Sequence, residues 1–308
     1  MKTNSPGRAA HGKADSLRNA GFRGSVSLEA PLAPLTTWRI GGPAEILAAP
    51  GDVEDLRIAL DWADKQEIPW RVLGNGSNLL VSDEGVRGLI LRIRRVLDNV
   101  EVKDDGIVAG AGASFPAVAR VAARAGLSGL EFGAGIPGTI GGAIVMNAGW
   151  HEFEIGAAVA TVDYLERNGE PRRISPDAST FTYRDSYFRG RSGIVTATTL
   201  RLTRGDAGEI EQRMEAFAAS RKLNQPTELA SCGSVFLKPE GDFAGRLIDE
   251  AGLKGVREGG IEVSTKHANF FVNTGGGSAS DVLRLVERVE SAVLDRFGIR
   301  LVREFEHW

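Results

Sequence analysis

The stretch that decides the fold runs from Gly133 to Gly149 and reads GAGIPGTIGGAIVMNAG. Six of its 17 residues are glycine, and none carries a charge. Glycine loses much backbone entropy on folding, so this density predicts unusual dihedral angles or a close approach of the backbone to a neighbour. The stretch also contains a formal match to the dinucleotide-binding pattern GxGxxG, at Gly133, Gly135 and Gly138.

The surroundings of this match argue against a nicotinamide-binding fingerprint. Such a fingerprint follows a buried strand and opens a helix. Here Pro137 lies inside the pattern, and no strand of adequate length precedes Gly133. We interpret the stretch as a backbone wall against a flat or charged ligand. A glycine-rich turn that is needed only for packing is the alternative.

A second glycine-rich segment, Gly74 to Asn78, reads GNGSN and directly follows the expected strand over residues 70–73. Successive backbone N–H groups in such a loop can form a concave nest for phosphate oxygens. The Ser77 hydroxyl and the Asn78 amide would add hydrogen-bond donors. The segment therefore predicts a phosphate site, and a plain strand-to-strand turn is the alternative.

The composition is that of an ordinary globular protein, with 42% hydrophobic and 25% charged residues in a chain of 308. A net charge of −3 argues against broad nucleic-acid binding. The single Cys232 excludes an intramolecular disulfide, and the HxxxH and CxxC spacings that zinc needs are missing, so we expect no metal site. Without an apolar run of transmembrane length or a signal-peptide core, we expect a cytoplasmic protein with no membrane partner. We also expect a monomer, with residues 1–20 as a flexible tail.

Hydrophobic periodicity predicts an α+β chain. A first unit has strands and a helix over residues 44–49, 53–66, 70–73 and 88–93. A second unit has hairpins over 100–108 and 159–174, a helix capped by Ser114, and a strand over 194–202. The last third has helices over 207–222, 243–251 and 280–297 and strands over 267–273 and 301–305.

Two further segments offer reactive or charged side chains. Ser231, Cys232 and Ser234 supply two hydroxyls and a thiol, but triad chemistry needs a histidine base. The only histidines are at positions 11, 151, 267 and 307. The sequence identifies none of them as that base, so we disfavour a hydrolase. Arg184 and Arg189 flank aromatic residues, which fits a solvated ion-pairing arginine or a clamp for a carboxylate or phosphate.

Six segments together point to a known family. They are TWRIGG (37–42), LGNGSNLLVSD (73–83), GIPGTIGG with MNAG (135–142, 146–149), YRDS (183–186), GSVF (233–236) and KHANF (266–270). In this order and spacing the chain resembles the UDP-N-acetylenolpyruvoylglucosamine reductase family from about residue 25 to its C-terminus. Each motif alone is modest evidence, whereas six in order are specific.

The resemblance implies an FAD-binding module of the vanillyl-alcohol-oxidase/PCMH type, with two α+β subdomains over 21–95 and 96–205. A smaller α+β substrate-binding domain would span 206–308, its terminal strand returning to the active site. The chain looks like the shorter family variant, which lacks an added tyrosine-bearing loop. FAD would be bound tightly and non-covalently, with NADPH as co-substrate. The residues implied for FAD are Arg39, Gly74, Asn75, Gly76, Ser77, Asn78, Gly135, Ile136, Pro137, Gly138, Thr139 and Gly142.

The resemblance also implies a reaction. NADPH would reduce FAD, and the enolpyruvyl ether of UDP-N-acetylglucosamine would take hydride at its methylene carbon, giving UDP-N-acetylmuramate for peptidoglycan. Arg184 would bind the carboxylate on which charge develops, Glu304 would polarise or orient the intermediate, and Ser234 would donate a proton to the α-carbon. The residues implied for substrate binding are Tyr183, Lys238, Lys266, His267 and Asn269.

Three segments depart from the family pattern. Leu237-Lys238 stands where the family usually has Lys-Asn, Glu306 stands where a basic residue is common, and residues 150–153 (WHEF) replace a glycine-bearing turn. Two alternatives stay open. One is a different flavin oxidoreductase on the same scaffold, with Cys232 or His151 as candidates for a covalent flavin link. The other is a flavin- or UDP-sugar-binding paralogue that is not an enzyme.

Overall fold

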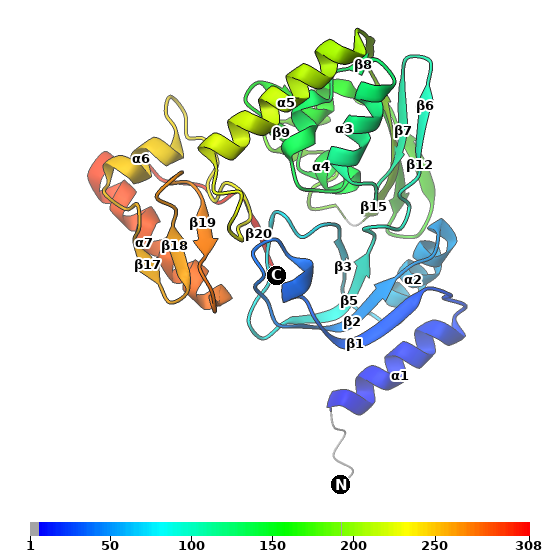
Figure 1. Ribbon diagram of the computed structural model, residues 1–308. Coiled ribbons are helices and arrows are strands. Elements are labelled where there is room, and N and C mark those ends of the chain that lie inside the picture. The colour runs from blue at the N-terminus through cyan, green and yellow to red at the C-terminus, as the bar shows by residue number, and fades with distance from the viewer. Residues whose placement is uncertain (1–5, 192) are drawn as a thin grey trace. The chain divides into compact units, whose positions relative to one another are not determined.

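The computed structural model of the chain describes residues 6–191 and 193–308, which divide into two compact units. Unit 1 contains the described residues up to Ala30, residues 44–75 and residues 87–218. Unit 2 contains residues 31–43, 76–86 and 219–308. Each unit is therefore completed by segments that are distant in the sequence (Figure 1).

The first sheet of unit 1 has the strand order β1-β2-β5-β3, formed by Ser25–Pro31, Pro43–Ala49, Val86–Arg92 and Trp70–Leu73. Residues of β2 alternate between half-buried and buried, as in a strand with one face on the core. β3 and β5 run parallel, with Trp70 opposite Leu89. Helix α2 (Val53–Lys65) follows β2 and buries Leu56 and Leu60. The elements predicted over residues 44–93 are confirmed, whereas β1 was not predicted.

Helix α1 (Pro6–Asn19) differs from the flexible tail expected over residues 1–20. Ala10, Ala14 and Leu17 are buried at i, i+4 and i+7, so one face of the helix packs on the core. Lys13 of α1 also pairs with Glu45 of β2 at 2.6 Å. The tail prediction is wrong from Pro6 onward because these small and apolar residues pack; residues 1–5 lie outside the described residues.

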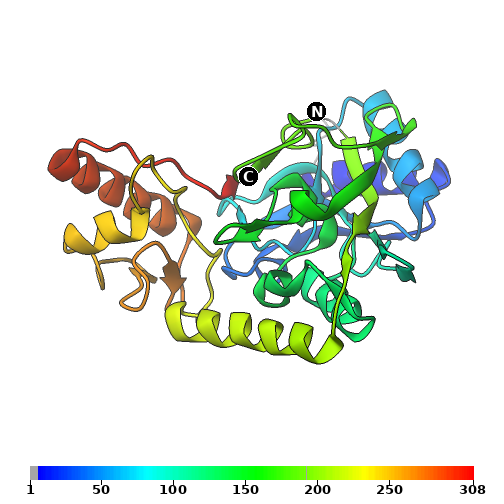
Figure 2. The ribbon, with the colours of Figure 1, turned by 90° about the horizontal axis from the view of Figure 1, so that it is seen from above.

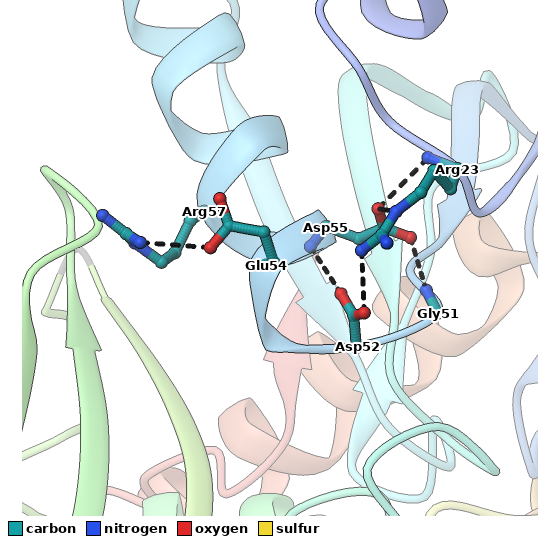
Figure 3. Close-up of polar contacts among 6 residues, drawn as sticks. All are labelled: Arg23, Gly51, Asp52, Glu54, Asp55 and Arg57. Carbon is teal, nitrogen blue, oxygen red and sulfur yellow. Dashed lines mark hydrogen bonds and ion pairs between the residues drawn. The ribbon is translucent and has the colours of Figure 1, made fainter.

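A polar cluster holds the N-terminus of α2 (Figure 3). Asp52 caps the helix by accepting a 2.9 Å hydrogen bond from the Asp55 amide. The Asp55 carboxylate, 1% exposed, accepts from the amides of Gly51 and Arg23 and from Arg23 Nε. Burial raises the pKa of Asp55, but these hydrogen bonds and the Arg23 charge outweigh it, so its pKa lies below the usual value.

The second sheet of unit 1 is antiparallel and has the order β12-β11-β15-β7-β6. Its strands are Pro171–Ile174, Val159–Glu166, Gly193–Arg201, Gly106–Gly110 and Val100–Lys103. Both predicted hairpins are confirmed. Helices α3 (Phe115–Arg124) and α4 (Ile140–Val145) belong to the same unit, and α5 (Ala207–Asn224) is one continuous helix in Figure 2. Helix α3 is confirmed, but the Ser114 side chain makes no capping hydrogen bond.

Unit 2 contains the antiparallel sheet β17-β18-β19 (Arg257–Glu258, Ile261–Val263, Phe271–Asn273) with helices α6 (Ala244–Glu250) and α7 (Ala279–Phe297). Helix α7 buries the apolar face that its periodicity predicts, from Val282 to Val293. The strand predicted over residues 267–273 is shorter in the structure, where only β19 (Phe271–Asn273) pairs with a neighbouring strand. The terminal strand predicted over 301–305 is wrong. The last strand is β20 (Glu306–His307), which pairs in parallel with β4 (Leu79–Leu80).

Candidate active site

The two glycine-rich motifs meet in unit 1. A Cβ atom added to Gly74, the residue after β3, would lie 2.6 Å from Thr139 Oγ1. Thr139 is the N-cap of α4, and its Oγ1 accepts a 3.3 Å hydrogen bond from the Gly142 amide. A larger residue at position 74 would force Thr139 to shift, and this close approach shows that the end of β3 lies next to the start of α4.

The backbone around this contact is well suited to hold an anion. Gly138 O and Ala113 O accept hydrogen bonds from Phe115 N and Ile140 N, which ties the start of α4 to the start of α3. Within residues 6–191 and 193–308, the N–H groups of Gly74 and Asn75 donate to no backbone carbonyl. Half-buried N–H groups of this kind can bind the diphosphate oxygens of a dinucleotide. The N–H donors of Gly74 and Asn75, in a cradle that Gly74 lines without a side chain, therefore fit FAD.

The dinucleotide pattern at Gly133 to Gly138 is not a Rossmann fingerprint. Gly133 and Gly135 lie in the 3-10 helix η2 (Glu131–Gly135), which is not preceded by a strand of the main sheets. A Cβ on Gly133 would lie 2.5 Å from the Phe115 ring, and one on Gly141 would lie 2.9 Å from Ala111 Cβ. Packing alone therefore explains these two glycines. Gly135, Ile136 and Gly138 are half-buried and Pro137 is exposed.

The rest of the glycine-rich segment, Gly76 to Asn78, is anchored within unit 2. Gly76 has φ of +59°, and a Cβ there would lie 2.4 Å from Leu35 O. Asn78 Nδ2 donates to Glu304 O at 3.1 Å, and Asn78 O accepts from Glu306 N at 2.9 Å. Ser77 is half-buried. Arg39, also predicted to bind the cofactor, is exposed and has φ of +59°.

Ser234 and Glu304 lie on neighbouring segments of unit 2. Glu304 N donates to Val235 O at 2.8 Å, and Phe236 and Arg303 form an antiparallel bridge. Ser234 itself bridges to Phe270 on its other side. Both predicted catalytic side chains are half-buried. The structure therefore brings together two residues that are 70 positions apart in the sequence.

Cys232, a buried thiol, lies close to the same segments. Burial raises the pKa of its thiol, and the nearby Glu304 charge raises it further. Because the thiolate is the nucleophile, a thiol held neutral is a poor one. Cys232 is 6% exposed, which fits a small buried residue.

The substrate residues predicted in unit 2 have different surroundings. Asn269 is 6% exposed, and its Nδ2 and Oδ1 bond to the backbone O and N of Phe236 at 2.8 and 3.0 Å. Its amide therefore holds the segment that carries Ser234, and contact of Asn269 with substrate stays a prediction. Burial lowers the pKa of His267, whose Nδ1 accepts from Asn269 N. Lys266 Nζ donates to Lys222 O at 2.7 Å, and exposed Lys238 lies 4.4 Å from the Phe243 ring centroid.

Arg184 is held within unit 1, in the turn between β13 (Phe181–Thr182) and β14 (Asp185–Ser186). Its φ is +55° and its side chain is 14% exposed. Nη2 donates to Gly149 O at 2.8 Å, and Nη1 donates to Glu154 Oε1 at 3.3 Å. The Tyr183 ring centroid lies 5.1 Å from the guanidinium carbon, and Tyr183 is 49% exposed. The MNAG and YRDS motifs therefore meet at Arg184.

Sequence reasoning missed Glu154 as a partner of Arg184. The two residues are 30 positions apart, and no spacing rule connects a residue of one hairpin to the turn of a later one. The only signal was the unusual WHEF segment that immediately precedes Glu154. The role of Asn78 in holding the Glu304 backbone was missed for the same reason.

In residues 6–191 and 193–308, no group of three or more His, Cys, Asp or Glu side chains could hold a metal ion. No helix in this part of the chain is long and apolar enough to span a membrane.

Known proteins match the chain over most of its length. Residues 44–175 match the family described as FAD binding domain, and residues 225–308 match the C-terminal domain of UDP-N-acetylenolpyruvoylglucosamine reductase. The UDP-N-acetylenolpyruvoylglucosamine reductase of Moorella thermoacetica is 44% identical over 94% of this chain and 95% of its own. That of Heliobacterium modesticaldum is 43% identical over 92% of this chain and 90% of its own. The crystal structure of UDP-N-acetylenolpyruvylglucosamine reductase from Thermus caldophilus superposes with a TM-score of 0.80, at 40% identity over 93% of this chain and 99% of that one.

Proposed function

The chain belongs to the UDP-N-acetylenolpyruvoylglucosamine reductase family and is an FAD-dependent oxidoreductase, and on this premise we propose its reaction. It reduces the enolpyruvyl ether of UDP-N-acetylglucosamine to UDP-N-acetylmuramate, with NADPH as the electron donor. The observation that carries this proposal is the juxtaposition of Ser234 and Glu304 on adjacent segments of unit 2, in a chain of this family. The proposed product is a precursor of peptidoglycan.

FAD, when bound, would carry hydride from NADPH to the enolpyruvyl group. The cradle at Gly74 and the N–H groups beside it would hold the diphosphate. Residues 135–142 would line the cofactor with backbone rather than with charged side chains. Binding would be non-covalent, in agreement with the neutral thiol of Cys232.

Three side chains would act on the substrate. Reduction of the enolpyruvyl double bond develops negative charge on the adjoining carboxylate, which the planar fork of Arg184 would bind. Glu304 would polarise or orient the resulting enolate-like species. Ser234 Oγ–H would donate its proton to the α-carbon. A hydroxyl is a weak acid, but the carbanion-like centre beside it is strongly basic, so the transfer is feasible at near-attack distance.

The remaining assignments follow from the same proposal. Tyr183, Lys238, Lys266 and His267 would contact the UDP-sugar. Residues 21–95 and 96–205 would be the two FAD-binding subdomains, and 206–308 would bind substrate. The enzyme would act as a cytoplasmic monomer on small molecules, without a nucleic-acid or membrane partner.

One experiment tests the proposed reaction. The purified protein should carry flavin absorbance, and NADPH oxidation should accelerate when the enolpyruvyl sugar nucleotide is added. A colourless protein would overturn the proposal. If the rate of NADPH oxidation did not change on addition of the sugar nucleotide, another flavin oxidoreductase would be favoured instead. Flavin binding without any turnover would favour a binding protein.

A further inference from the structure

A short hairpin over residues 149–154 contacts Arg184 at both of its ends. It is formed by β9 (Gly149–Trp150) and β10 (Phe153–Glu154), in which Glu154 pairs with Gly149. Gly149 O accepts from Arg184 Nη2 at 2.8 Å, and Glu154 Oε1 accepts from Nη1 at 3.3 Å. Two different nitrogens of one guanidinium are therefore bound by one hairpin, which restricts the plane of the group.

The Glu154 carboxylate is itself held in place. Its second oxygen, Oε2, accepts from Asn147 Nδ2 at 2.7 Å. Asn147 is 1% exposed, and its amide also donates to Thr182 O at 2.8 Å and accepts from Gly156 N at 3.0 Å. The two carboxylate oxygens thus have separate partners, so Glu154 cannot rotate without losing one of them.

Aromatic packing fixes the hairpin on the rest of unit 1. Trp150 and Phe153 contact Phe217 of α5, with ring centroids 5.3 and 5.6 Å apart. Phe153 also stacks on Phe132 of η2 at 5.9 Å. A Cβ on Gly149 would lie 2.1 Å from Phe153 O and 3.0 Å from Arg184 Nη1, so glycine is required where the hairpin meets the arginine.

We propose that Glu154 is a positioning residue that orients the Arg184 guanidinium toward the substrate carboxylate. The inference rests on the proposed function, which makes Arg184 the carboxylate clamp. A guanidinium is a rigid planar fork of N–H donors, so the partners that hold its Nη1 and Nη2 also fix the plane in which a ligand carboxylate would meet it. A bidentate contact depends on the plane of that fork, and Glu154 sets this plane.

Ligand binding to the flavin-loaded enzyme tests the inference without turnover. UDP-N-acetylmuramate carries the carboxylate, whereas UDP-N-acetylglucosamine lacks it. By isothermal titration calorimetry, Glu154→Gln should weaken binding of the first about tenfold, as expected for a displaced charge-assisted hydrogen bond, and leave the second unchanged. Glu152→Gln, which changes an exposed carboxylate at the tip of the same hairpin, should affect neither.

A second measurement separates positioning from a structural role. NADPH should bleach the flavin of Glu154→Gln at the wild-type rate, while reoxidation by the enolpyruvyl substrate should slow about tenfold or more. In an Arg184→Lys background, Glu154→Gln should cost much less, because the fork that it orients is gone. Equal slowing of both half-reactions, or equal losses in the two backgrounds, would overturn the inference.

The outcomes distinguish a failure of this inference from a failure of the proposed function. If wild-type enzyme fails to reoxidise with the enolpyruvyl substrate, the proposed function is wrong and the inference falls with it. If wild type reoxidises and Glu154→Gln does so at the same rate, the inference alone is wrong. Should Glu154→Gln lose flavin absorbance, Glu154→Asp keeps the charge on a shorter arm. The inference then requires that Glu154→Asp weaken only the carboxylate-bearing ligand.

Discussion

Ser234, the proposed proton donor, lies in a segment that backbone contacts hold on both sides. It bridges to Phe270, and the following Val235 accepts from Glu304 N at 2.8 Å. Asn269 completes the support through its two hydrogen bonds to Phe236. At the scale of single residues, the proposed role of Ser234 can therefore be tested by substitutions that change its side chain and leave the backbone contacts intact.

Ser234→Ala should slow flavin reoxidation by the enolpyruvyl substrate about 10²- to 10⁴-fold, the usual contribution of a general acid. NADPH should still bleach the flavin normally, because that step needs no proton on the substrate. Stopped-flow absorbance of the two half-reactions measures this. Ser231→Ala, which removes a neighbouring hydroxyl, is the matched control. Reoxidation of Ser234→Ala at the normal rate would exclude Ser234 as the proton donor.

Gly74→Ala should impair FAD retention, because its Cβ would lie 2.6 Å from Thr139 Oγ1. Relief of such an overlap costs about 1–3 kcal/mol. The ratio of flavin to protein absorbance after purification measures retention. Adding Thr139→Ala removes the clashing oxygen and should restore part of the flavin, despite the lost N-cap. Gly12→Ala, with nothing within 4 Å of the added Cβ, should retain FAD fully.

At the scale of elements, α1 shows how packing turns a segment that looks like a tail into part of the core. Leu17→Ala should lower the free energy of unfolding by about 3 kcal/mol, because Leu17 is 0% exposed and its loss leaves a cavity. Chemical denaturation measures the change, with exposed Asn19→Ala as the control. If Leu17→Ala were neutral, α1 would not be docked on the core.

The cluster at the start of α2 predicts a pH dependence. Asp55 has a pKa below its unfolded value, so the stability that it contributes is fully present above an unfolded pKa of about 4. That contribution is lost as the pH falls through the lower, folded pKa. Asp55→Asn should therefore be less stable than wild type at neutral pH, and its stability should fall less between about pH 4 and pH 2. Denaturation midpoints across that range test this, and parallel curves would contradict it.

At the scale of the whole molecule, the proposed diphosphate cradle predicts which flavin stabilises the fold. FAD added at about 100 times its Kd to protein stripped of flavin should raise the free energy of unfolding by about 2.7 kcal/mol. Riboflavin has the same ring system without the diphosphate and should stabilise much less. Thermal unfolding with each ligand measures the difference. Equal stabilisation would show that the loop at Gly74 is only a turn.

The sequence by itself determined most elements of this protein and its family. The elements over residues 44–93, the two hairpins and α7 were predictable because their signals are local: a two-residue or 3.6-residue period, or a turn residue. The glycines could be identified as special for the same kind of reason, since a missing Cβ is a property of one residue. The α+β FAD-binding fold predicted from the motifs is confirmed.

Only the tertiary structure decided which residues support the site. Glu154 and Asn147 meet Arg184 across 30 and 37 positions, and Asn78 meets Glu304 across 226. The hydrogen bond from Asn269 to Phe236, the docking of α1 and the position of β20 depend on similar long-range contacts. No local pattern encodes such pairs, because a hydrogen bond between distant residues depends on the path of the whole backbone. The motifs can therefore be identified from the sequence, whereas the residues that contact them are identified only from the tertiary structure.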